Sequence, residues 1–167
     1  RSPSRGLGDV YKRQASTRAG NVIGGGDWAA NRIIPDCIRA FKNDKPVTIR
    51  SPLSTRPWQH VLEPLSGYLQ LASELYDQPK KFSGSWNFGP AVSSPLNVEQ
   101  VTREIIKHYG KGDLIIHKPK NSFHEANLLQ LNCDKVTQEL HWQPNWSTEE
   151  TLEATAIWYK RYLSLIH

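Results

Sequence analysis

One segment of this chain places glycine, asparagine and arginine where they could bind an anion. This segment, residues 18–36, reads Arg-Ala-Gly-Asn-Val-Ile-Gly-Gly-Gly-Asp-Trp-Ala-Ala-Asn-Arg-Ile-Ile-Pro-Asp. Its three consecutive glycines lack a Cβ, so the backbone there can adopt positive φ and lie close to a ligand. Arg32 stands at the start of an apolar helical pattern. A guanidinium beside helix N-terminal N–H groups suits a phosphate or diphosphate.

Three further residues carry side chains of suitable chemistry. Arg56 lies in the segment Thr-Arg-Pro-Trp-Gln-His-Val at residues 55–61, and its planar fork of donors matches the geometry of a phosphate group. His124 and Glu125 belong to a polar loop that precedes an apolar stretch. A neutral histidine can donate a hydrogen bond to a hydroxyl or a phosphate, while a glutamate accepts one.

Each of these residues also has an interpretation that requires no ligand. Asn21 can serve turn geometry alone, because asparagine bonds its own backbone and tolerates left-handed conformations. Asp27 and Trp28 can cap and anchor the following helix, although Trp28 can equally pack near a substrate. Arg32 can be a solvated side chain, and His124 with Glu125 an exposed loop. His60 and Glu63 can orient the turn after residue 59 or contact a ligand.

The elements that must position these residues alternate between strand and helix patterns. Strands are expected over residues 15–23, 47–50, 56–61, 84–89, 113–117 and 126–131. Helices are expected over residues 33–41, 62–76, 97–109, 134–140 and 147–163. Asn97 with Gln100, and Ser147 with Glu150, have the spacing of capping residues. The tryptophans at 86, 142, 146 and 158 are interpreted as packing residues. The pattern predicts an α/β fold with no second domain boundary.

Composition excludes several classes of protein. Hydrophobic residues make up 38% and charged residues 22% of the chain, as in globular proteins. No apolar run approaches the roughly 20 residues that span a bilayer, and residues 1–5, Arg-Ser-Pro-Ser-Arg, lack the apolar core of a signal peptide. We therefore expect no membrane association and a cytoplasmic location. Residues 1–14 carry +3 of the +5 net charge, and without a basic stripe elsewhere we expect no nucleic-acid binding. Cys37 and Cys133 form no Cys-x-x-Cys pair, and no His/Cys cluster has metal spacing.

Three motifs resemble those of extended short-chain dehydrogenase/reductases that act on nucleotide sugars. The block Asn-Val-Ile-Gly-Gly-Gly-Asp-Trp at residues 21–28 resembles the end of a core strand and its following loop. Residues 55–61 resemble an Arg-Asp-x-x-x-Val element, with Pro57 in place of the aspartate, a departure shared with the dehydratases of CDP-linked sugars. Residues 140–144, Leu-His-Trp-Gln-Pro, resemble a Leu-Gly-Trp-x-Pro turn. The resemblance runs from Ala15 to about Leu163.

The resemblance implies an α/β fold that is the C-terminal part of a Rossmann-like enzyme, incomplete without its N-terminal cofactor-binding half. Neither a Gly-rich dinucleotide fingerprint nor a Tyr-x-x-x-Lys catalytic pair occurs in the chain, so no catalytic residue is assigned. Residues 1–14 match nothing in the family and are expected to be a foreign or disordered leader. Residues 15–163 are the expected substrate-binding portion, and residues 164–167 a tail.

The resemblance also implies an activity and roles for individual residues. It implies a homodimeric NAD-dependent sugar-nucleotide 4,6-dehydratase that makes a 4-keto-6-deoxy sugar from CDP-glucose, for deoxysugar synthesis and O-antigen lipopolysaccharide. This chain would be inactive alone. Its implied contacts are Ala19 and Gly20 with nicotinamide; Asn21, Arg32 and Arg56 with the diphosphate; Trp28 with substrate; and His124 and Glu125 with ribose and base. The alternatives are a non-catalytic nucleotide-sugar-binding module and another NAD-dependent epimerase or dehydratase.

Overall fold

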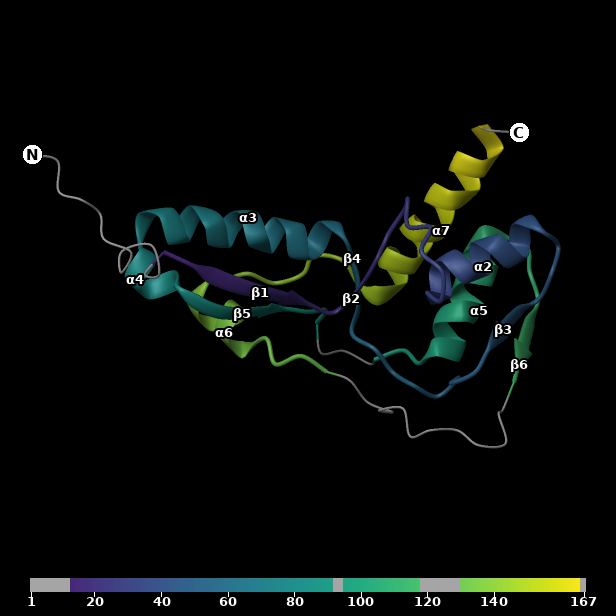
Figure 1. Cartoon of the computed structure of the whole chain (residues 1–167), viewed down its shortest axis with the longest axis horizontal. Coiled ribbons are helices and arrows are strands. Elements are labelled where there is room, and N and C mark those ends of the chain that lie inside the picture. Colours follow the sequence, from purple (N-terminus) through teal and green to yellow (C-terminus); the bar gives the residue numbers. More distant parts are fainter. Residues whose placement is uncertain (1–12, 92–94, 118–129, 166–167) are drawn as a thin grey trace, which may run out of the picture.

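The computed structural model describes residues 13–91, 95–117 and 130–165, and shows an α/β arrangement of parallel strands and helices (Figure 1). In chain order the elements are β1 (Ala15–Ala19), β2 (Asn21–Ile23), α2 (Ile33–Lys42), β3 (Val47–Ile49), β4 (Trp58–His60), α3 (Leu62–Asp77), α4 (Pro79–Phe82), β5 (Gly84–Phe88), α5 (Val98–Tyr109), β6 (Leu114–Ile116), α6 (Asp134–Glu139) and α7 (Thr148–Leu165). The predicted α/β class is confirmed. Apart from residues 15–23 and 126–131, each predicted helix or strand has a counterpart of the same type. Of the predicted strand over residues 126–131, residues 126–129 lie outside the described residues, and residues 130 and 131 are not in a strand.

The predicted strand over residues 15–23 is two strands that belong to different sheets. β1 pairs in parallel with β5, and β2 pairs in parallel with β4. The change occurs at Gly20, whose N–H donates to the Phe88 carbonyl at 3.1 Å, while the next N–H, of Asn21, donates to the Pro57 carbonyl at 2.8 Å. A Cβ on Gly20 would lie 2.3 Å from the Pro57 carbonyl oxygen. Only glycine therefore allows the chain to cross between the two sheets here.

Two groups of helices cover the strands. α3 lies along one side of the β1–β5 pair and α6 along the other (Figure 1). At the opposite end of the molecule, α2, α5 and α7 gather near the parallel β3–β6 pair. Among the described residues no helix is long and apolar enough to cross a membrane.

The two groups enclose separate cores. The larger is built from buried side chains of α2, α5, α7 and strands β2, β3 and β4: Ile23, Ile34, Cys37, Ile38, Phe41, Val47, Ile49, Trp58, Val101, Ile105, Tyr109, Leu152, Ala156, Tyr159 and Leu163. The smaller contains Leu71, Phe82, Trp86, Phe88, Val136, Leu140 and Trp142. Packing of Trp86 and Trp142 is thereby confirmed. Trp146 and Trp158 instead remain 36% and 40% exposed, so these two rings are only partly packed.

Both predicted capping pairs are confirmed by their hydrogen bonds. Asn97 accepts from the Gln100 N–H at 2.8 Å, and Gln100 accepts from the Asn97 N–H at 2.9 Å. Glu150 accepts from the Ser147 N–H at 2.8 Å, and the Ser147 hydroxyl accepts from the Glu150 N–H at 3.2 Å. These contacts satisfy amides that lack helical partners, and they set where α5 and α7 begin.

The apolar repeat that predicts α3 lies on the exposed side of that helix. Leu62, Leu65, Leu69 and Tyr76 are 45–82% exposed, and we call these four residues the α3 stripe. The buried side of α3 consists of Glu63, Pro64, Gly67 and Leu71. Contiguous exposed apolar side chains mark a contact surface, so the helical period identifies the helix but not the face that packs within this chain.

Replacing Gly67 by alanine should destabilise the fold. A Cβ at this position would lie 2.3 Å from Cε1 of Phe88 and 3.1 Å from Cε2 of Trp142. Overpacking of this kind costs about 1–3 kcal/mol, which exceeds the gain of up to ~1 kcal/mol from the helix propensity of alanine. Urea unfolding should show a net loss for Gly67→Ala, and no loss for Ser73→Ala at an exposed position of α3. Equal stability of Gly67→Ala and the parent would contradict the packing of α3 on β5.

Candidate functional site

The glycine triplet after β2 is explained first by close packing. A Cβ on Gly24 would lie 2.9 Å from Cγ1 of Val61, and one on Gly25 would lie 2.1 Å from Cδ2 of Trp158. Gly26 has a φ of +81°, a conformation that residues with side chains rarely adopt. The triplet therefore lets residues 24–32, here called the glycine loop, lie against β4 and α7 on its way to α2.

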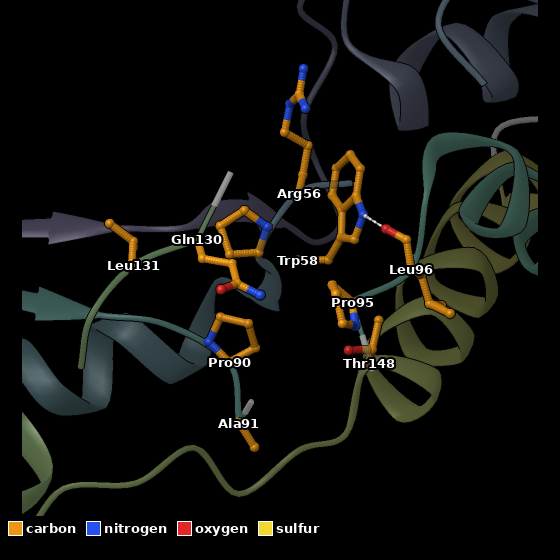
Figure 2. A pocket seen from close by; sticks show the side chains of 10 residues that line it. Arg56, Trp58, Pro90, Ala91, Pro95, Leu96, Gln130, Leu131 and Thr148 are labelled. Carbon is orange, nitrogen blue, oxygen red and sulfur yellow. Dashed lines mark hydrogen bonds between the residues drawn. The ribbon is translucent and has the colours of Figure 1, made fainter. Parts of the chain in front are cut away.

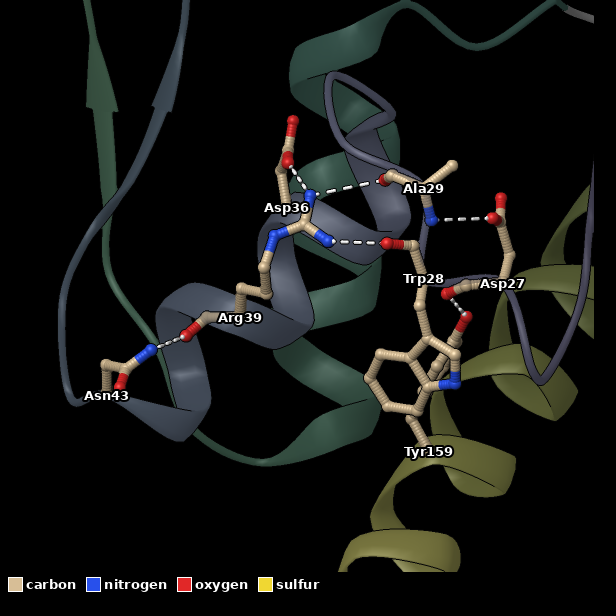
Figure 3. Close-up of polar contacts among 7 residues, drawn as sticks. All are labelled: Asp27, Trp28, Ala29, Asp36, Arg39, Asn43 and Tyr159. Atoms are coloured by element: carbon tan, nitrogen blue, oxygen red, sulfur yellow. Dashed lines mark hydrogen bonds and ion pairs between the residues drawn. The ribbon is translucent and has the colours of Figure 1, made fainter.

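Asp27 is one of two polar anchors of the glycine loop (Figure 3). Its carboxylate accepts from the Ala29 N–H at 3.0 Å and pairs with Arg32 at 3.0 Å, and its carbonyl accepts from the Tyr159 hydroxyl at 2.6 Å. Desolvation would raise the pKa of Asp27, but the Ala29 N–H and the Arg32 guanidinium together hold it below its usual value. No side chain caps α2, so the expected capping role of Asp27 is replaced by a bond within the loop.

Arg39 is the second anchor, and sequence reasoning missed it. Its guanidinium donates to the Trp28 carbonyl at 3.0 Å and the Ala29 carbonyl at 3.2 Å, and it pairs with Asp36 one turn earlier on α2 (Figure 3). Nothing in the local pattern points to backbone acceptors ten and eleven residues away. The only local signal is the Asp36–Arg39 spacing, which is also common on solvated helices.

Trp28 lies against α7. Its ring meets Tyr159 edge-on at a centroid distance of 5.2 Å and Tyr162 at 5.8 Å. The side chain remains 43% exposed. A cavity lies beside the glycine loop, and Trp28 is not among the residues that line it. The structure therefore supports the anchoring interpretation of Trp28, and a substrate contact stays a prediction.

A cavity of about 510 Å³ opens between β2, β4 and the start of α2. It brings together four of the sequence-predicted site residues, Gly20, Asn21, Arg32 and Arg56. The other lining residues are Val22, Ile23, Gly24, Asp27, Asn31, Ile33, Ile34, Pro35, Trp58 and Val98. Ala19, the remaining predicted cofactor contact, ends β1 outside this lining. The described lining residues include two arginines and one aspartate, which is a positive balance.

The start of α2 adds donors to this cavity. Arg32 is the N-cap residue, and no side-chain hydrogen bond satisfies the first turn of α2. Ile33 and Ile34 begin the helix and line the cavity, while Pro35 has no N–H to leave unsatisfied. The partial positive charge of a helix N-terminus and its orphan N–H groups favour an anion at this end.

A second, smaller cavity of about 60 Å³ adjoins Arg56 (Figure 2). Its walls are Arg56, Pro57, Trp58, Pro90, Ala91, Pro95, Leu96, Gln130, Leu131 and Thr148. Trp58 is held in position because its Nε1–H donates to the Leu96 carbonyl at 3.0 Å. Arg56 and Trp58 line both cavities. The predicted contacts His124 and Glu125 lie outside the described residues.

His60 and Glu63 orient the chain around the site. His60 is 8% exposed and its Nδ1 accepts from the Leu62 N–H at 3.3 Å, while its ring lies 4.4 Å from that of Trp146. Both oxygens of Glu63 accept from backbone N–H groups, of Asn145 at 2.9 Å and Trp146 at 3.1 Å. Of the two interpretations left by the sequence, the structure supports orientation of the turns before α3 and α7.

His60 should titrate below its ordinary range. Burial lowers the pKa of His60, and attraction to Glu63 opposes this shift. Because the folded pKa lies below the unfolded value of about 6.5, the neutral ring contributes fully to stability above that pH, and the contribution falls as pH decreases toward the folded pKa. An NMR titration should give a His60 midpoint below 6.5, and a lower one still in Glu63→Gln. A midpoint at or above the ordinary value would contradict the burial of this ring.

Comparisons with known proteins agree with this geometry. No protein-family model matches the chain. A CDP-glucose 4,6-dehydratase from Salmonella typhimurium (strain LT2) is 47% identical over 149 residues, which are 89% of this chain and 42% of the relative. The chain thus spans less than half the length of that relative.

Two solved structures share the fold at low sequence identity. A dTDP-glucose 4,6-dehydratase from Bacillus anthracis in complex with NAD superposes with a TM-score of 0.69 at 21% identity, over 88% of this chain and 44% of the other. A UDP-glucose-4-epimerase from Stenotrophomonas maltophila, with bound NAD and formylated UDP-arabinopyranose, gives 0.76 at 15% identity, over 96% of this chain and 53% of the other. The chain is therefore similar over most of its length to part of a CDP-glucose 4,6-dehydratase, and it has the fold of about half of the sugar-nucleotide dehydratase and epimerase structures.

Proposed function

We propose that this chain supplies the diphosphate and nucleotide contacts of a CDP-glucose 4,6-dehydratase that makes CDP-4-keto-6-deoxyglucose. The observation that carries the proposal is the larger cavity, which joins Asn21, Arg32 and Arg56 to the uncapped start of α2. Guanidinium groups and helix N-terminal amides are the groups that bind phosphates in proteins. The 47% identity to a CDP-glucose 4,6-dehydratase gives this anion site its expected ligand.

The two cavities suit two neighbouring parts of a nucleotide sugar, the diphosphate and the base. The larger, with its positive balance, takes the diphosphate, with the Asn21 amide available as a further donor. The smaller has walls of proline, leucine and tryptophan, which match the flat, apolar faces of a base. Arg56 stands at the boundary and would contact a phosphate oxygen. His124 and Glu125 remain proposed contacts to the ribose and base.

Asp27 prepares Arg32 for this role. The 3.0 Å ion pair holds the guanidinium beside the cavity. Against the opposing effect of burial, the Ala29 N–H and Arg32 lower the pKa of Asp27, so the pair persists to more acidic pH. Arg32 remains largely exposed in the pair, so its other donors stay open to an incoming phosphate. Asn21, Arg32 and Arg56 thus bind and orient the substrate.

NAD is the proposed cofactor of the complete enzyme. Gly20 lines the larger cavity, and its Cα carries no side chain, which allows a flat ring to approach closely. Ala19 and Gly20 would supply backbone against the nicotinamide. When bound, NAD would accept and return the hydride that the reaction requires. No group of this chain is assigned a proton-transfer role, and we propose that the chain alone is inactive.

Two exposed surfaces of this chain support the proposal that the complete enzyme contains further polypeptide. β1 pairs with β5 on one edge only in the described structure, and the α3 stripe is exposed. The matched region covers 42% of the Salmonella relative, and the remaining length could contribute a neighbouring strand and an apolar surface. We place the complete enzyme in the cytoplasm as a homodimer that serves deoxysugar and O-antigen synthesis.

The diphosphate site can be tested by calorimetry of the purified chain with CDP-glucose. Replacing Arg56 by alanine should weaken binding about 10- to 100-fold, since hydrogen bonds between charged groups contribute about 1.5–3 kcal/mol. The matched control is Arg103→Ala on α5, where the arginine pairs with Glu99 and does not line either cavity. Equal affinity in all three proteins would exclude the proposed role of Arg56.

Complementation separates a dehydratase part from a free-standing binding module. Co-expression with the unmatched N-terminal portion of the Salmonella relative should restore NAD-dependent conversion of CDP-glucose, which neither piece achieves alone. Leu69→Glu in the α3 stripe should block assembly without unfolding this chain, whereas Gln138→Glu, exposed on α6, should not. An assembled but inactive pair that still binds CDP-glucose would favour the module. Recovery of a 4-epimer as product would identify an epimerase instead.

A further inference from the structure

Three potential metal ligands meet between α5 and α7, on residues not assigned to the nucleotide-sugar site. Glu104 and His108 lie one turn apart on α5, and Glu149 lies in the first turn of α7. One ligand atom from each residue lies within 4.8 Å of the others. The two helices pack against each other in the fold, so the cluster depends on tertiary contact and has no sequence motif.

The His108 ring has a nitrogen that the described residues do not fully satisfy. Its Nε2 is buried from solvent and makes no hydrogen bond within the described residues, and Oε2 of Glu104 lies 3.4 Å from it, while the side chain as a whole is 14% exposed. A buried polar atom without a hydrogen bond costs about 1–3 kcal/mol. A water or an ion bound beside Glu104 would satisfy this nitrogen.

The spacing of the first two ligand atoms fits a tetrahedral ion. His108 Nε2 and Glu104 Oε2 are 3.4 Å apart. Two ligands on a tetrahedral Zn²⁺ with bonds of about 2.0–2.1 Å lie about 3.3–3.4 Å from each other. The carboxylate of Glu149 is exposed, so it can rotate to complete the site without disturbing the core.

A lysine already lies beside the cluster. Lys107 Nζ lies 2.8 Å from Glu104 Oε2. Because the Lys107 side chain is 60% exposed, it can move away from this carboxylate when a metal ion binds.

We propose that His108, Glu104 and Glu149 form a Zn²⁺ site that ties α5 to α7, with water as the fourth ligand. The imidazole nitrogen selects zinc over Mg²⁺ or Ca²⁺, which prefer oxygen ligands alone. The site is separate from the nucleotide-sugar contacts and does not depend on the proposed function. Zinc binding would stabilise the packing of α5 against α7. This pair of helices carries Thr148, which lines the smaller cavity, and Val98, which lines the larger one.

The test is ZnCl2 titration of the full chain after removal of metal with a chelator. Calorimetry should give one Zn²⁺ per chain, and thermal unfolding should shift to higher temperature with added zinc, because a ligand of the folded state stabilises it. Glu149→Gln, at an exposed position, should weaken zinc binding at least about tenfold and leave the zinc-free unfolding temperature unchanged. His108→Ala should do the same to binding. Glu139→Gln and His141→Ala, at exposed positions elsewhere, are the matched controls.

Ring-nitrogen NMR and Co²⁺ absorption identify the ligands directly. Zinc should shift the His108 Nε2 resonance, and Co²⁺ should give a spectrum without a thiolate charge-transfer band, since Cys37 and Cys133 are outside the cluster. Zinc binding that persists unchanged in both Glu149→Gln and His108→Ala would overturn the proposal. So would the absence of zinc binding, which would leave Glu104 and His108 as an ion pair only.

Discussion

The carbonyl of Phe88 at the end of β5 is the junction on which the site depends. It accepts from the Gly20 N–H at 3.1 Å and from the Gln59 side chain at 2.9 Å. These two bonds join the β1–β5 sheet to the β2–β4 sheet at the point where the chain crosses between them. Asn21 and Arg56 reach the same cavity because β2 and β4 diverge from β1 there. Since Gln59 is buried, its amide makes this bond away from competing water.

The residues around the cavity divide into those that hold the backbone and those that face the ligand space. The first group holds the glycine loop against β4, α2 and α7 through close packing and hydrogen bonds, and it consists of Gly24, Gly25, Arg39 and Tyr159. A loop held by a guanidinium on two carbonyls and by a buried tyrosine has little freedom, so it presents Arg32 at a defined place. Preorganisation of this kind lowers the entropy cost of binding.

The two cores are held together by different kinds of contact. The larger core closes α2, α5 and α7 around their own strands, with capping residues at the starts of α5 and α7. The smaller core rests on aromatic packing between Phe88 and Trp142, whose rings meet at a centroid distance of 5.1 Å. It leaves the opposite side of α3 exposed and one edge of β1 without a strand in the described structure. The part of the molecule nearest to the α3 stripe is therefore the part most dependent on further contacts.

The sequence by itself determined the order and type of nearly all described elements, both capping pairs and the relationship to nucleotide-sugar enzymes. These features are local or depend on matched motifs, since a capping hydrogen bond spans three residues and a helical period repeats every 3.6. It also placed Asn21, Arg32 and Arg56 among the ligand candidates, and the cavity brings these three together. Their contacts with substrate stay predictions.

Tertiary structure alone decided the rest. The strand break at Gly20 follows from pairing with β5 and then β4, which are more than thirty residues away. The anchoring role of Arg39, the position of Trp28 on α7 and the meeting of His108 with Glu149 likewise depend on which helices pack together. The apolar repeat of α3 shows why local patterns do not predict such contacts. Periodicity reveals that one face of a helix is apolar, but long-range packing decides which element covers that face.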